Sequence, residues 1–226
     1  MGQLDHILEK NRAWANGVKT ADPNFFDRLS NQQAPEYLWI GCADSRVPAN
    51  QIVDMLPGEV FVHRNVANIV IHTDFNCLSV LQFAVEVLKV KHVIVVGHYG
   101  CGGISAALLN KGYGLIGNWL RHIQDIRDRY QSVLDDLPTE RDQIDRLCEL
   151  NVVEQVDHVC QNSIVQEAWK SGQKLTVHGL VYDLADGILR DMGLSVSSEQ
   201  EHLQNKQCSI DELISRPVRS GRQRKL

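Results

Sequence analysis

Two short apolar segments of this chain each end in side chains that can bind a metal. Residues 37–41 and 93–97 are dominated by aliphatic and aromatic side chains, and each run is about as long as one strand. Runs of this length and composition predict buried strands. Because ligands of open parallel sheets bind beyond the carboxyl ends of the strands, the side chains after the two runs are expected to share one site. These side chains are Cys42, Asp44, His98 and Cys101.

The order of the segments predicts an α/β fold with a mostly parallel central sheet flanked by helices. Strand-like runs alternate with helix-like patterns, which implies parallel strands joined by right-handed crossovers. Asp186-Gly187 then predicts a hairpin turn into a last short strand. The expected strands are residues 37–41, 59–64, 93–97, 174–182 and 188–190. Helices are expected after Thr73 or Asp74, after Gly100 to Gly103, and near residues 115–132, 138–149 and 151–171.

The chain of 226 residues contains no repeat or linker that would divide it, so one domain is expected over residues 1–215. Residues 1–32 predict a helical arm, which we expect to pack on a neighbouring subunit. Residues 216–226 hold five basic and no acidic side chains and predict a disordered tail.

Charge and hydropathy exclude two classes of partner. The net charge of the chain is −5, and the five basic residues of the tail leave −10 on residues 1–215. An acidic body argues against nucleic acid as the main partner. No apolar run approaches the roughly 20 residues that span a membrane. The charged first fourteen residues do not resemble a signal peptide, so a cytoplasmic location is expected.

The predicted site contains the ligand types that zinc takes, namely thiolate, imidazole and carboxylate. His98 and Cys101 are three residues apart at a loop-to-helix transition, so both can reach one ion. No Cys-x-x-Cys pair is present, which excludes that redox motif. Each half alone is weak evidence, because a Cys-x-Asp-x-Arg loop can simply hold an ion pair. Together, at matched strand ends, they predict one Zn²⁺ site.

Three motifs resemble those of the β-class carbonic anhydrases, in particular the bacterial members, and the likeness extends from about Trp14 to Asp186. The resemblance implies four parallel strands with an antiparallel edge strand, and a homodimer that assembles into a homotetramer. It also implies one Zn²⁺ per chain, held by the two cysteines and the histidine. The motifs are Cys42-x-Asp44-Ser-Arg46, Arg64-Asn65-x-Ala67-Asn68 and Gly97-His98-x-x-Cys101-Gly102-Gly103.

The chemistry expected of such a site is the reversible hydration of CO₂ to bicarbonate and a proton by zinc-bound hydroxide. Asp44, paired with Arg46, would orient the hydroxide. Released from Arg46, it would bind zinc as a fourth ligand and close the site. Activity is therefore expected to be low at neutral pH and to rise in mild alkali, as hydroxide displaces the carboxylate.

By resemblance, a subclass of the family closes when bicarbonate binds a separate pocket, and the positions of Trp39, Arg64 and Tyr182 match that pocket. Read without the family, Trp39 and Tyr182 would be core residues and Arg64 part of an ion pair. The resemblance also makes Gln33 of the neighbouring subunit a donor to bicarbonate. It implies an apolar CO₂ pocket lined by Phe61 and Val66.

Two alternative functions stay open. The same zinc could hydrolyse a CO₂-like sulfur compound such as carbonyl sulfide or carbon disulfide. Alternatively, Asp44 could close the site permanently and make the zinc structural. Arg46 argues against the second alternative, because a four-ligand structural site needs no arginine to hold the carboxylate away.

Overall fold

One five-stranded sheet organises the chain, whose computed structural model describes residues 2–31, 33–112 and 114–216. The strand order within the described residues is β2-β1-β3-β4-β5. The first four strands run parallel, and β5 pairs antiparallel with β4. This arrangement confirms the predicted sheet with an antiparallel edge strand. The strands are β1 (Tyr37–Cys42), β2 (Val60–Asn65), β3 (His92–His98), β4 (Thr176–Asp183) and β5 (Ile188–Val196).

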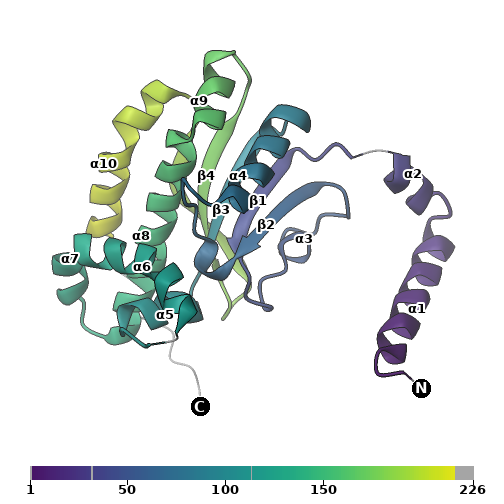
Figure 1. The fold of residues 1–226 in the computed structure, drawn as a ribbon, viewed down its shortest axis with the longest axis horizontal. Coiled ribbons are helices and arrows are strands. Elements are labelled where there is room, and N and C mark those ends of the chain that lie inside the picture. The colour runs from purple at the N-terminus through teal and green to yellow at the C-terminus, as the bar shows by residue number, and fades with distance from the viewer. Residues whose placement is uncertain (1, 32, 113, 217–226) are drawn as a thin grey trace.

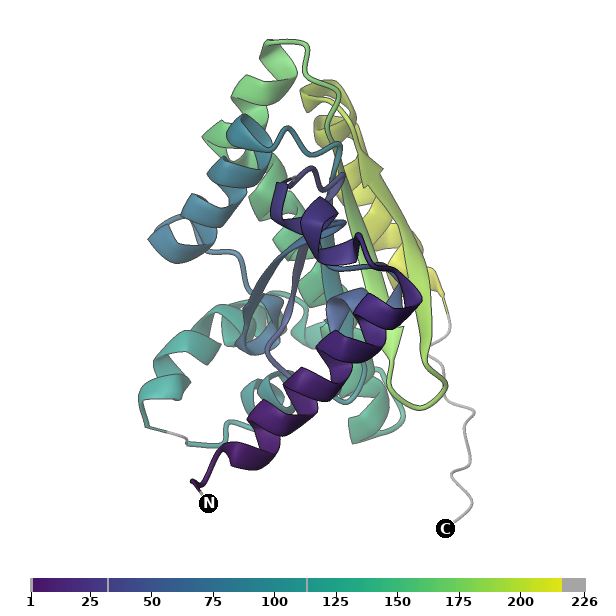
Figure 2. The ribbon, with the colours of Figure 1, turned by 90° about the vertical axis from the view of Figure 1, so that its right-hand side faces the viewer.

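The main core lies between the sheet and the larger helices, several of which lie on the same side of the sheet in Figure 1 and Figure 2. A π-helical turn, η2, continues α4, and a single 3₁₀ turn, η1, follows β2. The helical elements are α1 (Asp5–Ala21), α2 (Phe25–Asn31), α3 (Ala49–Ile52), η1 (Val66–Asn68), α4 (Phe75–Gln82), η2 (Phe83–Val87), α5 (Gly102–Leu108), α6 (Leu115–Arg129), α7 (Gln131–Asp135), α8 (Glu140–Gln161), α9 (Ser163–Lys170) and α10 (Glu199–Ser215).

The opposite face of the sheet carries a second, smaller apolar cluster that is only partly covered. Trp39, Val96 and Ala49 of α3 are buried there, and residues of β2, β3, β4 and β5 pack against them half-buried. In β4, buried and half-buried residues alternate along the strand, as in a sheet with one well-covered face. Much of this face is therefore available to a second protein surface.

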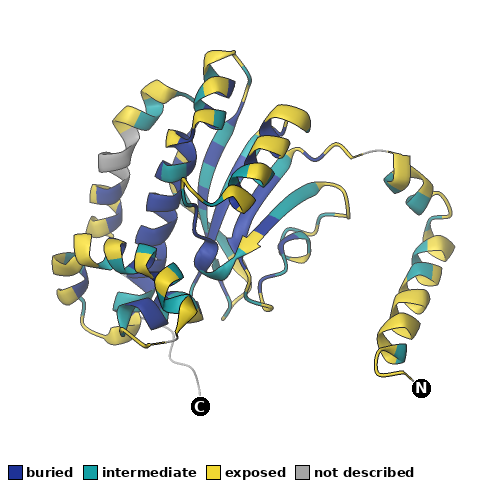
Figure 3. Cartoon of the chain, in the orientation of Figure 1, coloured by how far each residue is buried: buried dark blue, intermediate teal, exposed yellow. Residues whose placement is uncertain are grey.

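The N-terminal arm extends away from the sheet (Figure 1), and Figure 3 shows it as largely exposed. No residue of α1 or α2 is buried, although Leu4, Ile7, Leu8 and Trp14 form an apolar stripe that is at least half exposed. The predicted helical character of the arm is confirmed, and two helices form it. An apolar stripe with this exposure normally packs on another surface.

The predicted break between helices 138–149 and 151–171 is wrong. α8 continues through these positions, and the break falls at Asn162, whose side chain accepts a hydrogen bond from the Ile164 amide and caps α9. Asn151 does not end the helix, because its side chain is buried and bonded to a loop rather than to its own backbone.

The C-terminal part holds more regular structure than expected. β5 extends to Val196, and α10 is capped by Ser198, whose hydroxyl accepts a hydrogen bond from the Glu201 amide. Of the predicted tail, residues 217–226 lie outside the described residues. The carbonyl of Arg216 accepts a hydrogen bond from Arg146 at 2.6 Å. No helix in the described part of the chain is both long and apolar enough to cross a membrane.

Candidate metal centre

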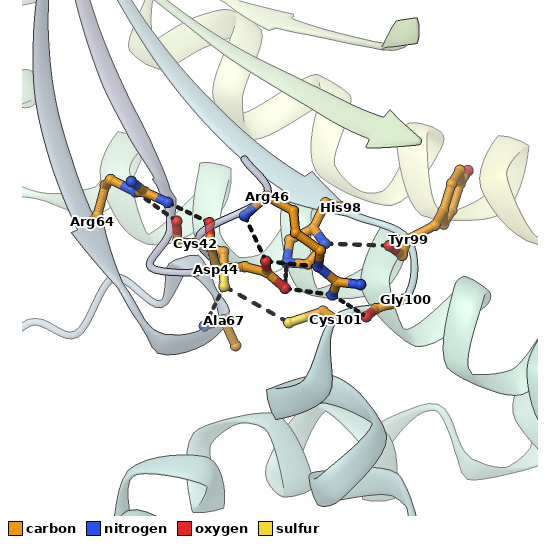
Figure 4. Close-up of polar contacts among 9 residues, drawn as sticks. All are labelled: Cys42, Asp44, Arg46, Arg64, Ala67, His98, Tyr99, Gly100 and Cys101. Atoms are coloured by element: carbon orange, nitrogen blue, oxygen red, sulfur yellow. Dashed lines mark hydrogen bonds and ion pairs between the residues drawn. The ribbon is translucent and has the colours of Figure 1, made fainter. Parts of the chain in front are cut away.

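Cys42, His98 and Cys101 converge where neighbouring strands end (Figure 4). Cys42 is the last residue of β1, His98 is the last residue of β3, and Cys101 precedes the first turn of α5. β1 and β3 are adjacent and parallel, so their carboxyl ends lie side by side. The two sulfur atoms are 3.9 Å apart, and the ligand atoms of all three side chains lie within 4.8 Å of one another.

The three side chains fit a zinc ion in both spacing and protonation. Zinc–sulfur bonds of about 2.3 Å in a tetrahedron separate two thiolates by roughly 3.8 Å. Nδ1 of His98 donates to the Tyr99 carbonyl at 3.2 Å, which leaves the lone pair of Nε2 free. That Nε2 is a buried atom with no hydrogen-bond partner among the described residues. A buried acceptor of this kind is what a metal site requires.

The two thiols are strongly coupled. The contact with Cys101 is the main reason that the pKa of Cys42 is lowered, and the same contact together with burial raises the pKa of Cys101. The pair therefore favours one thiolate that accepts a hydrogen bond from the other thiol. A divalent cation between the two sulfurs would release the remaining proton.

Asp44 lies beside this cluster but is held by Arg46. Its Oδ1 accepts hydrogen bonds from Arg46 N and Nε, both at 2.9 Å, and its Oδ2 accepts from Nη2 at 2.6 Å. These hydrogen bonds keep the pKa of Asp44 well below its usual range. Arg46 Nη2 also faces the Gly100 carbonyl at 3.4 Å, which links the pair to the loop that carries Cys101.

A turn after β2 forms another wall of the site. The amide of Ala67 donates to Cys42 Sγ at 3.4 Å, and Ala67 has a left-handed backbone with φ of 66°. The half-buried Val66 lies in the same turn, and its carbonyl accepts from Trp119 Nε1 at 2.8 Å. Phe61 lies half-buried on β2, the strand that leads into this turn, and its ring centroid is 5.8 Å from that of Phe83. The motif that contains Ala67 carried no signal for this backbone conformation.

Trp39 and Arg64 lie on the adjacent strands β1 and β2, whereas Tyr182 lies on β4, beyond β3. Trp39 and Tyr182 belong to the same apolar cluster. Trp39 is 1% exposed, yet its Nε1 has no hydrogen-bond partner among the described residues. Arg64 donates to the carbonyls of Cys42 at 2.8 Å and Asp44 at 2.5 Å.

Gln33 is the predicted site residue that a single chain does not bring to the cluster. It lies exposed in the connection between α2 and β1, and no hydrogen bond joins it to the metal ligands in the described part of the chain. The prediction assigned Gln33 to the site of a neighbouring subunit, which one chain cannot test.

Fold and site together define the class: an α/β protein in which two cysteines and one histidine form a cluster that could hold a metal ion, beside an ion-paired carboxylate. A family model described as carbonic anhydrase matches residues 37–189. A carbonic anhydrase of Emericella nidulans is 46% identical over 190 residues, which cover 84% of this chain and 83% of that protein.

Solved structures agree with the sequence match. The Coccomyxa β-carbonic anhydrase in complex with acetazolamide has a TM-score of 0.86 at 40% identity, covering 94% of this chain and 99% of that chain. A tetrameric β-carbonic anhydrase of the filamentous ascomycete Sordaria macrospora has a TM-score of 0.80 at 38% identity, covering 86% and 98% of the two chains. The chain therefore belongs to the β-class carbonic anhydrases, a family of zinc lyases. Membership of the bacterial branch stays a prediction.

Proposed function

We propose that this chain catalyses the reversible hydration of CO₂ to bicarbonate and a proton, with one Zn²⁺ held by Cys42, His98 and Cys101. The observation that carries the proposal is the position of Asp44, whose Oδ2 lies 3.8 Å from His98 Nε2 while Arg46 holds it. An ion held by these three residues would thus keep a fourth coordination place, beside the carboxylate, for water. A purely structural site would have no need of the ion pair.

Zinc supplies the central chemistry, because as a Lewis acid it lowers the pKa of a water molecule towards about 7 and makes hydroxide available near neutral pH. Asp44 is a hydrogen-bond acceptor only, since Arg46 keeps it ionised. It would orient the attacking oxygen by accepting a hydrogen bond from it in a fixed direction. Phe61 and Val66 offer CO₂ an apolar wall, and Gln33 of a neighbouring chain donates to bicarbonate.

We further propose that the site switches between two states. With Asp44 on Arg46 the site is open, and with Asp44 on the metal it is closed. A three-residue pocket on the open side of the sheet would bind bicarbonate and favour closure. The unpartnered Nε1 of Trp39 is a donor available to an anion there. Arg64 connects this pocket to the site, because it donates to the carbonyl of Asp44 itself.

The assembly is proposed to be a homodimer that pairs into a homotetramer. The partly covered sheet face and the apolar stripe of the arm are both surfaces that a second copy would bury. The relative from Sordaria macrospora is tetrameric. Light scattering on the full chain and on a variant without residues 1–32 tests this assignment.

We place the protein in the cytoplasm, a reducing compartment that suits its five described cysteines, all of them buried and free.

Stopped-flow CO₂ hydration across pH, together with the zinc-to-chain ratio of the same preparation, tests the catalytic proposal. One zinc per chain and turnover above the buffer rate are expected. A preparation with full zinc content and no turnover at any pH would favour a structural site instead.

A further inference from the structure

The turn that borders the metal centre is fastened to α8 by a buried chain of amides. Asn151 Nδ2 donates to the Ala67 carbonyl at 3.0 Å, and its Oδ1 accepts from Gln155 Nε2 at 2.9 Å. Gln155 Oε1 in turn accepts the amide of Val70 at 2.8 Å. Both side chains are 0% exposed. Buried amides must be paired. These hydrogen bonds between Asn151, Gln155 and the turn therefore specify one position of the turn relative to α8.

Ala67 is the residue that most needs such a restraint. Its φ of 66° and ψ of 26° place it in the left-handed region, which is unfavourable for any residue with a Cβ. Such a conformation persists only where the surroundings hold it. The hydrogen bond from Asn151 fixes the carbonyl of Ala67, and the amide of the same residue points at Cys42 Sγ, 3.4 Å away.

A hydrogen bond to a ligand sulfur changes what the sulfur does for a metal. It withdraws electron density from the thiolate and weakens its donation to the ion. Two thiolates would otherwise cancel the charge of Zn²⁺ and make it a weak Lewis acid. One N–H···S bond would therefore act on the Lewis acidity of the ion, which is the property that activates water.

We propose that Asn151 is a positioning residue for the metal centre: by holding the left-handed peptide of Ala67 it keeps the N–H···S bond to Cys42 in place and sets the electron donation of that thiolate. Asn151 touches neither the metal nor the substrate. The inference rests on the proposed zinc site and adds a residue 84 positions away in sequence from the turn that it controls.

The test compares cobalt-substituted proteins, because the thiolate-to-cobalt charge-transfer band reports sulfur donation independently of activity. Asn151→Ala should move this band to longer wavelength. In the zinc enzyme it should lower kcat at neutral pH roughly tenfold, with a smaller deficit in alkali. Cys160→Ala is the matched control, because Cys160 is buried on the same helix and takes no part in the hydrogen bonds that join Asn151, Gln155 and the turn. It should leave the band in place.

A second variant separates positioning from mere filling of the core. Ala67→Gly removes the penalty of the left-handed backbone, so the double variant Asn151→Ala/Ala67→Gly should recover part of the band position and of the pH profile. A role in packing alone predicts no recovery. If Asn151→Ala folds poorly, the near-isosteric Asn151→Asp, which lacks the donor, takes its place.

The outcomes distinguish the two proposals. A wild-type protein that takes up neither cobalt nor zinc overturns the proposed function. A wild-type protein that binds cobalt, with a band and pH profile that Asn151→Ala and Asn151→Asp leave unchanged, overturns only the role of Asn151.

Discussion

The Asp44 carboxylate lies 3.8 Å from Nε2 of His98, a member of the candidate metal-binding cluster. It is nevertheless fully engaged elsewhere, because Arg46 donates three hydrogen bonds to it. Tetrahedral zinc bonds of about 2.1 Å would place the imidazole nitrogen and a carboxylate oxygen roughly 3.4 Å apart, so Asp44 lies near the place of a fourth ligand while Arg46 holds it. In the proposed switch, this relationship corresponds to the open state.

Arg46→Ala is expected to abolish most turnover while the metal stays bound. Without the guanidinium, Asp44 is free to occupy the fourth coordination place, so kcat for CO₂ hydration should fall about 10²-fold with full zinc content. Lys170→Ala, which removes an exposed ion pair with Glu167, is the control and should be silent. Turnover at the wild-type level in Arg46→Ala would show that the ion pair has no catalytic role.

Cys42→Ser is expected to lose the metal, whereas Cys77→Ser is expected to keep it. Both thiols are buried, but Cys77 belongs to no cluster of metal ligands in the described part of the chain, and burial raises its pKa to about 12. Zinc content after dialysis against a chelator provides the measurement. Equal retention by the two variants would rule out Cys42 as a ligand.

The convergence of the ligands could be predicted from the sequence because it depends only on parallel strand order. Cys42 and His98 each follow an apolar run, and adjacent parallel strands bring such ends together. The backbone of Ala67 could not be predicted, since alanine gives no sign of a left-handed turn. Nor could the contact with Asn151, because a buried amide in a helix looks like any polar helical residue until its partner is known.

The helical half of the chain was the harder part for a similar reason. α8 is buried on almost every side, including charged positions such as Arg146 and Glu154, so it lacks the polar stripe by which a helix is recognised and bounded. Its ends are set by Thr139 and Asn162, which accept hydrogen bonds from amides of the first turns of α8 and α9. Those capping hydrogen bonds are local in sequence. They could not be predicted, because threonine and asparagine also occur at many positions that cap no helix.

Activity is expected to rise from neutral to mildly alkaline pH. Because Arg46 lowers the pKa of Asp44, this carboxylate stays ionised from about pH 6 to about pH 9 and its own titration cannot cause the rise. Two effects are expected to cause the increase: ionisation of the zinc-bound water, and hydroxide that competes with Asp44 for the metal. Stopped-flow rates at constant ionic strength measure it, and a flat profile over this range would contradict the switch.

Trp39→Phe is expected to weaken inhibition by bicarbonate. The substitution keeps an aromatic ring in the apolar cluster but removes the buried N–H that has no partner among the described residues. Initial rates at increasing bicarbonate should change from a sigmoidal towards a hyperbolic response. Trp169→Phe is the control, because Trp169 Nε1 donates to the Leu175 carbonyl at 2.8 Å, remote from the site. The same sigmoidal response in Trp39→Phe and in the wild type would exclude the pocket.

Asp145→Asn is expected to stabilise the fold at neutral pH and not in acid. Burial is the main reason that the pKa of Asp145 rises from 3.8 to about 6, with Glu149 and Asp183 adding like charge against a contribution from Arg141. The folded state therefore holds this proton more tightly than the unfolded chain does.

The sign follows from linkage. Below about pH 4 the carboxyl is neutral in both states and the substitution should change little. As pH rises through about 6, the charge of Asp145 progressively favours unfolding, and its removal should gain on the order of 2 kcal/mol. Urea unfolding at pH 4 and pH 7.5 measures the difference, with the exposed Asp125→Asn as the control. Equal effects at both pH values would show that the fold does not raise the pKa of Asp145.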